Sequence, residues 1–224
     1  MDGGNDSDKE YTTGYQYFLG MHIKMCHGPI TAITGINAGE YSLWRGNATG
    51  NTQIFINKPD LFGGKSREGG ISGYADIEFG GSDQAANDYL ITQLPKVSGN
   101  RGVVGIVLRQ MYLGDNPYLK SLAIRGKNNT SLWQSAKSAI GDDMNPAHII
   151  RECLLNKLWG LGYLSSDLDD ESFIAASDTL YSEELGLSLL WNTSISIKGF
   201  IDLILDHIDG VLYVDISTGL FVLR

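Results

Sequence analysis

Two imidazoles and a thiol lie close together near the start of the chain, at His22, Cys26 and His27. These side chains bind zinc, but a structural zinc site needs four ligands, so another would have to come from elsewhere. The surrounding residues predict a β-strand, in which successive side chains point to opposite faces. His22 and Cys26 would then share one face and His27 the other, so the pattern favours strand packing over a metal site.

A glycine-rich stretch contains the Gly64-Lys65-Ser66 sequence of a phosphate-binding loop. The full pattern requires a further glycine at the position that Pro59 occupies, and a helix that begins directly after the loop. Here the residues that follow predict a strand. The stretch is therefore interpreted as a hairpin loop that contacts a neighbouring molecule.

Other candidate groups are better explained by structure. Asp167, Asp169 and Asp170 resemble the start of a calcium loop, but the glycine and the distal glutamate are not at the required spacing, and helix capping accounts for all three. His148 and Cys153 diverge on a helix, because they are not at i, i+3 or i+4 spacing.

Sequence motifs for nucleophilic or zinc-dependent hydrolysis, G-x-S-x-G and H-E-x-x-H, do not occur. A carboxylate pair for glycoside hydrolysis stays open, since such a pair comes from distant positions. The tryptophans lie mostly in apolar runs, which indicate core positions rather than a glycan-binding face; they are Trp44, Trp133, Trp159 and Trp191. We assign no catalytic residue, cofactor or metal ligand, and expect a protein that is not an enzyme.

The first part of the chain reads mostly as strands. Residues 1–13 are acidic and polar and predict a disordered leader. Strands are predicted at 14–27 with a bend at Gly20, and at 30–36, 41–44, 52–56, 71–79, 102–112 and 118–125, with a last short one beginning at 132–133. One helix is predicted from Ser82 or Asp83 to Leu94, with Ala86, Tyr89, Leu90 and Leu94 inward.

The strongest helix signals lie at 144–163, where Asn145 caps the helix, Pro146 occupies its first position and the apolar face runs to Leu158. Two more helices are predicted after 167–170 and after Ser196, with a short strand at 187–191 between them. A hairpin is predicted at 211–216 and 220–223. We place the main boundary near Gly141 and predict an α+β fold: a β-rich barrel or sandwich domain at 14–140, then a three-helix and hairpin domain at 141–224.

Composition limits the classes of partner. The net charge of −9 argues against sequence-specific nucleic-acid binding, which needs clustered lysine and arginine. No apolar run is long enough to cross a bilayer. Cys26 and Cys153 are expected to be buried free thiols, although a single disulfide stays open. The chain ends inside an apolar strand, so we expect its edge to be covered by further chain or by a neighbouring subunit.

Several stretches together resemble one family. They are YFLGMHIKMCHGPITAI at 17–33, DLFGGKSREGGISG at 60–73, LRQMYLGDNPYLK at 108–120, DMNPAHIIRECL at 143–154 and DGVLYVDISTGLFVLR at 209–224. In this combination and order they resemble the hub region of J-type tail tip attachment proteins, the host-specificity proteins of long-tailed phages and prophages. The resemblance extends from about Gly14 to the end of the chain.

The resemblance implies a structural virion component, made in the bacterial cytoplasm and placed at the tail tip. It implies a homotrimeric baseplate hub that closes or continues the tail tube and contacts the distal tail, tube and tape measure proteins. It supplies no catalytic motif. Full members are longer and carry fibronectin-like and receptor-binding segments that this sequence lacks.

Two glycine-containing loops are the candidates for subunit contacts. The residues are Gly63, Gly64, Lys65, Arg67 and Glu68 in the loop at 61–73, and Gly114, Asp115 and Asn116 in the loop at 113–117. The alternative functions are a tail-associated hydrolase of cell-wall or other glycans, and a glycan-binding β domain, which would show exposed aromatic side chains on a strand face.

Overall fold

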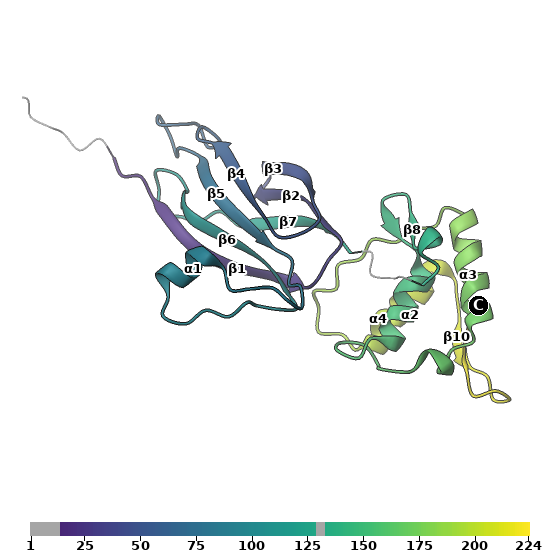
Figure 1. Ribbon diagram of the computed structural model, residues 1–224. Coiled ribbons are helices and arrows are strands. Elements are labelled where there is room, and N and C mark those ends of the chain that lie inside the picture. Colours follow the sequence, from purple (N-terminus) through teal and green to yellow (C-terminus); the bar gives the residue numbers. More distant parts are fainter. Residues whose placement is uncertain (1–13, 129–132) are drawn as a thin grey trace, which may run out of the picture. The chain divides into compact units, whose positions relative to one another are not determined.

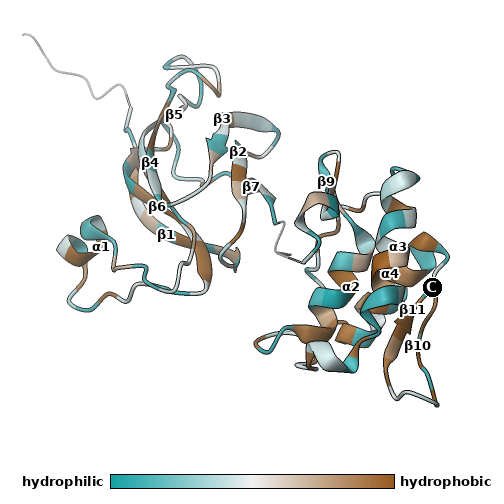
Figure 2. Cartoon of the chain, turned by 45° about the vertical axis from the view of Figure 1, so that its right-hand side comes forward, coloured by the Kyte–Doolittle hydropathy of each residue, from teal (hydrophilic) through white to brown (hydrophobic). Residues whose placement is uncertain are grey.

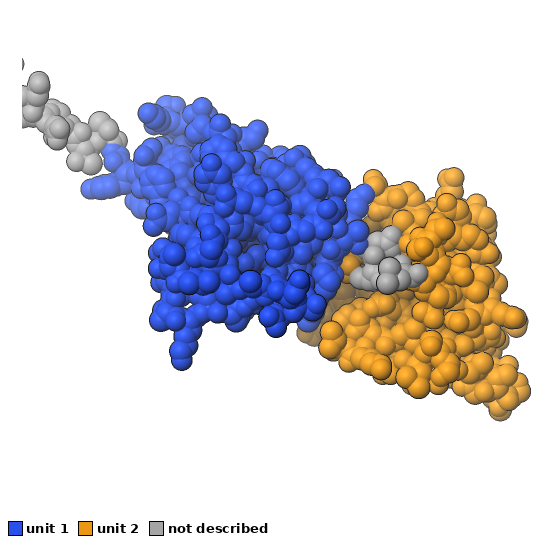
Figure 3. Space-filling model, viewed as in Figure 1, with its two compact units in different colours: residues 1–127 blue, residues 128–224 orange. Residues whose placement is uncertain are grey.

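The computed structural model describes residues 14–128 and 133–224, which form two compact units, 1–127 and 128–224 (Figure 3). The predicted leader at 1–13 lies outside the described residues. The division falls earlier than the boundary predicted near Gly141, because that glycine is the turn of a small hairpin in the second unit. The chain is α+β, with its strands in antiparallel sheets.

The first unit contains two antiparallel sheets (Figure 1). One has the strand order β1-β6-β5-β4, formed by β1 (Phe18–His27), β6 (Val103–Tyr112), β5 (Ile71–Glu78) and β4 (Thr52–Lys58). The other has the order β3-β2-β7, formed by β3 (Tyr41–Ala48), β2 (Ala32–Ala38) and β7 (Leu122–Lys127).

Both sheets contribute to one hydrophobic core, so they pack face to face. The core joins Ile33 and Ile36 of β2 to Ile77 of β5 and to Ile106 and Leu108 of β6, all of them at most 2% exposed. The strand β6 is buried along most of its length, as its unbroken apolar run predicts. A register shift in β1 falls at Gly20, where the bend was predicted.

The helix α1 (Asp88–Gln93) is shorter than predicted. Gln84 is buried, its side chain accepting from the Gly80 N–H and donating to the Gly99 carbonyl, which holds the preceding residues as a loop. The cap is therefore Asn87 rather than Ser82 or Asp83. Of the expected inward face Leu90 is buried, Ala86 and Tyr89 are partly buried, and Leu94 is 52% exposed.

The second unit has three helices around its own core. They are α2 (Pro146–Leu155), α3 (Asp170–Ser182) and α4 (Ile197–Ile208), with the short strands β8 (Ala139–Ile140), β9 (Asp143–Met144), β10 (Leu212–Val214) and β11 (Phe221–Leu223) and the 3-10 turns η1 (Ser135–Lys137) and η2 (Ser165–Asp167). Phe173 from α3, Ile150 from α2 and Ile204 from α4 are completely buried there.

The predicted caps are confirmed, but α2 ends early. Asn145, Asp169 and Ser196 each accept a hydrogen bond from a backbone N–H of the helix that follows. Asn156 is extended and its side chain accepts from the N–H groups of Leu158 and Trp159, which stops α2 at Leu155. Leu158 is consequently 95% exposed instead of facing the core.

Several predicted strands differ from the structure. The strand predicted at 14–27 begins only at Phe18, as β1. The strand predicted at 118–125 begins only at Leu122, as β7. The strand predicted at 187–191 is a single bridge between Leu187 and Met144. The short strand predicted at 132–133 is not seen at Trp133, which lies in a turn, while residue 132 lies outside the described residues.

The edge of the last strand is covered within the chain, contrary to expectation. β11 pairs with β10 on one side, and Figure 2 shows the pair as mainly hydrophobic. On its other side Asp169 N–H donates to the Phe221 carbonyl, and the Leu223 N–H donates to Ser172 Oγ. The start of α3 therefore protects this edge.

The two cysteines are free thiols with different environments. Cys153 is buried as predicted, whereas Cys26 is exposed, because it lies on the same outward side of β1 as the exposed Lys24, two residues earlier. The four tryptophans are partly buried against the two cores. Within the described residues, no helix has the length and apolar character to cross a bilayer.

Candidate subunit-contact surface

The two loops that sequence analysis selected lie against each other at one end of the four-stranded sheet. One loop connects β4 to β5 and the other follows β6. The Asp115 N–H donates to the Glu68 carbonyl at 3.0 Å, and Lys120 Nζ lies 2.8 Å from Glu68 Oε2. Segments distant in sequence therefore form one surface, which we call the loop junction (residues 61–70 and 113–120).

Glycine is required where the two loops touch. Gly114 has a φ of 117°, and a Cβ there would lie 2.6 Å from the Glu68 carbonyl oxygen. Gly64 and Gly69 face each other in a bridge and both have positive φ, which closes the tip between them into a tight turn. The glycines of the candidate loops thus set the backbone path.

Tyr112, the last residue of β6, holds the second loop of the junction through a side-chain hydrogen bond. The Tyr112 hydroxyl donates to Asp115 Oδ1 at 2.6 Å. Burial and this carboxylate raise the pKa of Tyr112 to about 12, so the phenol stays protonated and keeps donating at neutral pH. Asp115 is therefore held by its side chain as well as by its backbone.

The candidate residues divide into supporting and exposed groups. Gly64 and Gly114 are buried, Asp115 and Asn116 are partly buried, and Gly63, Lys65, Arg67 and Glu68 are exposed. Asn116 Oδ1 accepts from the Tyr118 N–H, which is a local turn contact. The charged side chains available to another molecule are hence those of Lys65, Arg67 and Glu68.

Sequence analysis missed Lys120 and Phe62. Lys120 Nζ lies 5.2 Å from the centre of the Phe62 ring, and Tyr41 packs edge-on against the same ring at 5.5 Å. Hydrogen bonding to Lys120 lowers the pKa of Glu68. Lys120 was assigned to a strand predicted at 118–125, and its position in a loop could have been suspected only from the preceding Pro117.

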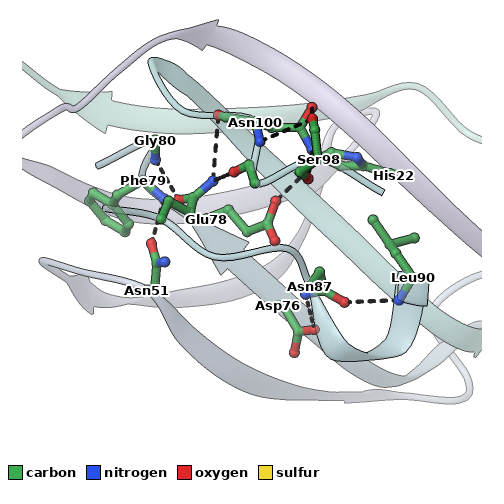
Figure 4. A network of polar contacts seen from close by, with 12 residues as sticks. His22, Asn51, Asp76, Glu78, Phe79, Gly80, Asn87, Leu90, Ser98 and Asn100 are labelled. Carbon is green, nitrogen blue, oxygen red and sulfur yellow. Dashed lines mark hydrogen bonds and ion pairs between the residues drawn. The ribbon is translucent and has the colours of Figure 1, made fainter. Parts of the chain in front are cut away.

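A second polar cluster lies on the outer side of the four-stranded sheet (Figure 4). Asp76 is 7% exposed and accepts from Gln53 Nε2, Asn87 Nδ2 and Arg109 Nε at 2.9, 2.8 and 2.7 Å. Arg109 also pairs with Asp88. Since Asn87 caps α1, the cluster fastens that helix to the sheet.

His22 is beside this cluster and is not placed for the metal site considered above. His22 Nε2 lies 3.4 Å from Glu78 Oε2, and burial raises the pKa of Glu78. Cys26 and His27 are exposed. Across residues 14–128 and 133–224, no three histidine, cysteine or acidic side chains gather at metal-binding distance.

The remaining candidates occupy structural positions. His148 is completely buried, its Nε2 lies 3.2 Å from Ser177 Oγ, and burial lowers its pKa to about 4. Burial raises the pKa of Cys153 to about 12, which leaves a protonated, weakly nucleophilic thiol. Asp167 accepts from the Leu164 N–H, and Asp169 caps α3. The strand β5, not a helix, follows the Gly64-Lys65-Ser66 loop.

No family model matches this chain, and no curated protein matches it.

Proposed function

We propose that this protein is a structural component of the tail tip of a long-tailed phage or prophage, where copies of its hub region associate. The loop junction is the observation that supports this proposal best. It presents Lys65, Arg67 and Glu68 on a backbone fixed by glycines and by the Lys120–Glu68 pair. A rigid, charged surface of this kind suits a defined contact between subunits.

The sheet borders also suit association. Within the described residues, β1 and β4 each have one neighbouring strand in their sheet, and β3 and β7 each have one in theirs. An edge strand offers backbone N–H and carbonyl groups that another chain can pair. The homotrimer, the neighbouring distal tail, tube and tape measure proteins and the location in the virion come from the resemblance and belong to this proposal.

The proposed role is not enzymatic. Asp76 accepts hydrogen bonds from three donors, so this buried carboxylate of β5 is engaged in holding the fold. A net charge of −9 suits a tube wall that DNA passes without binding.

The test is the mass of the protein in solution, measured by light scattering at several concentrations. A trimer is expected. In sedimentation, replacing Arg67 and Glu68 with alanine should weaken association, while Lys96→Ala, at another exposed position, should leave it unchanged. A monomer at every concentration would contradict the proposal.

One observation favours a second function, glycan binding. Phe55 of β4 and Tyr74 of β5 are 54% and 51% exposed, and their ring centres are 4.8 Å apart on one face of the sheet. Aromatic side chains on an open sheet face can stack on sugar rings. Binding of the wild-type protein to bacterial cell-surface polysaccharide, lost in Phe55→Ala and Tyr74→Ala, would support this alternative.

A further inference from the structure

A groove with an apolar floor runs along α3 in the second unit. Its volume is about 510 Å³, and it lies between α3, the end of α4 and the last strand β11. Ala176, Leu180, Ile208 and Leu223 contribute the apolar part of its lining. The groove belongs entirely to the second unit, so its shape does not depend on the first.

The polar lining of this groove is mainly acidic. It contains Asp169, Glu171, Glu183 and Asp209, with Arg224 as the cation among its lining residues. Asp169 is used as the cap of α3. Glu171, Glu183 and Asp209 are exposed, and none of them has an ion-pair partner in the part of the chain that the structure describes.

Two of these acids lie where a helix disfavours them. Glu183 is the C-cap of α3 and Asp209 is the C-cap of α4. The C-terminal end of a helix carries partial negative charge and favours a cation, so an acid there does not stabilise its own helix. Both helix ends therefore add to the negative potential of the groove, which makes it a site for a cationic group.

The first unit carries two cationic side chains, whose charge is opposite to that of the groove. Lys65 and Arg67 are exposed at the tip of the loop junction, and neither makes an ion pair within residues 14–128 and 133–224. The turn between Gly64 and Gly69 fixes the tip, which lowers the entropy lost on binding. Lysine and arginine also have apolar stems that can lie on an apolar floor while their charges meet acids at the rim.

We infer that the groove on α3 of one copy receives the Lys65 and Arg67 tip of a second copy. This inference rests on the proposed function and names the two surfaces that meet. A contact between different surfaces is heterologous, so each copy retains a free tip and a free groove, and a ring forms when the rotation closes.

The experiment reverses the charge on each side in the full chain. Lys65→Glu with Arg67→Glu alters the tip, and Glu171→Lys with Glu183→Lys alters the groove. Each pair should raise the dissociation constant for self-association by about tenfold or more. The variant that carries all four changes should recover much of the loss, because the charges again oppose each other.

Matched controls change charge elsewhere. Lys96→Glu alters an exposed loop of the first unit and Asp206→Lys an exposed position of α4 that does not line the groove. Both should leave the dissociation constant within about twofold of the wild type. Thr179→Tyr fills the groove without changing its charge and should also weaken association; circular dichroism of every variant checks that it is folded.

The outcomes separate this inference from the proposed function. Association that persists unchanged in the tip, groove and Thr179→Tyr variants would overturn the inference and leave the oligomeric role intact. Loss in the tip variant alone, without recovery in the fourfold variant, would also overturn it, because the groove would then not be the partner of the tip. A wild-type protein that is monomeric at all concentrations would contradict both this inference and the proposed function.

Discussion

Lys120 Nζ lies 2.8 Å from Glu68 Oε2, although 52 positions separate the two residues in the sequence. Lys120 also lies over the Phe62 ring, so one cation contacts both the start and the end of the β4–β5 loop. The pair joins the loop at 61–73, which was selected as a contact candidate, to Lys120, which follows the second selected loop at 113–117. It is the relationship on which the loop junction depends.

Replacing Lys120 with methionine should loosen the junction without unfolding the unit. The ion pair is exposed, so little change in the melting temperature is expected. The Asp115 amide, which donates to the Glu68 carbonyl, should exchange its hydrogen faster. Because the pKa of Glu68 is lowered in the folded protein, the pair persists above the ordinary glutamate pKa and is lost as the pH falls through the folded value. Unchanged exchange at Asp115 would show that the backbone contact does not need the ion pair.

Asp76→Ala should destabilise the first unit strongly. The substitution leaves Arg109, Gln53 and Asn87 without their shared acceptor beside a buried sheet face. Removing one partner of a largely buried ion pair costs about 3 kcal/mol or more of unfolding free energy. Urea unfolding measures it, and Asp88→Asn is the control, since the Asp88 side chain is 78% exposed and its loss should cost much less. Equal stabilities of the two variants would contradict the role given to Asp76.

Gly114→Ala should also destabilise the first unit, for a steric reason. The added Cβ would lie 2.6 Å from the Glu68 carbonyl oxygen, and the residue would keep a φ of 117°. We expect a loss of about 2 kcal/mol or more. Gly39→Ala is a matched control, because Gly39 also has positive φ but has open space around its Cβ position, so only conformational strain of about 1 kcal/mol is expected. A smaller loss in Gly114→Ala than in Gly39→Ala would argue against close contact of the loops.

The second unit should lose stability in mild acid because of His148. Burial lowers the pKa of His148 to about 4, below the unfolded value of about 6.5. The folded state therefore keeps its full stability above pH 6.5. Its stability falls as the pH drops from 6.5 towards 4, since only the unfolded chain takes up the proton on His148 in that range. The free energy of unfolding should fall by about 3 kcal/mol between pH 7 and pH 4. Nuclear magnetic resonance should show the His148 ring neutral at pH 5.5; an imidazolium signal at that pH would contradict the burial argument.

The two thiols should react at very different rates. Cys26 is exposed, and partial burial of its thiol raises its pKa, whereas Cys153 is buried and its pKa is raised to about 12. A thiol reagent at neutral pH should label Cys26 in the native protein and both cysteines in denaturant, as mass spectrometry of peptides can show. Rapid native labelling of Cys153 would mean that α2 opens readily. Cys26→Ser provides the control in which native labelling should disappear.

Local signals predicted the starts of α2, α3 and α4, but not that of α1, which begins after Asn87. Asn145, Asp169 and Ser196 are caps whose side chains can satisfy the first N–H groups of a helix whatever surrounds them, and all three do so. The apolar run of β6 likewise predicted a central strand. The signals were weaker for the end of a helix and for the exposed side of a strand. Asn156 ends α2 before Leu158, and Cys26 lies on the exposed side of β1 with Lys24.

The sequence by itself determined an α+β chain with capped helices, alternating strands and glycine-rich loops, because each of these depends on neighbouring residues. Only the tertiary structure decided that Glu68 meets Lys120, that Asp76 collects three donors, and that the start of α3 covers the edge of β11. Those contacts join residues from different elements. Their partners are set by strand order and by the packing of each unit, which no local spacing specifies.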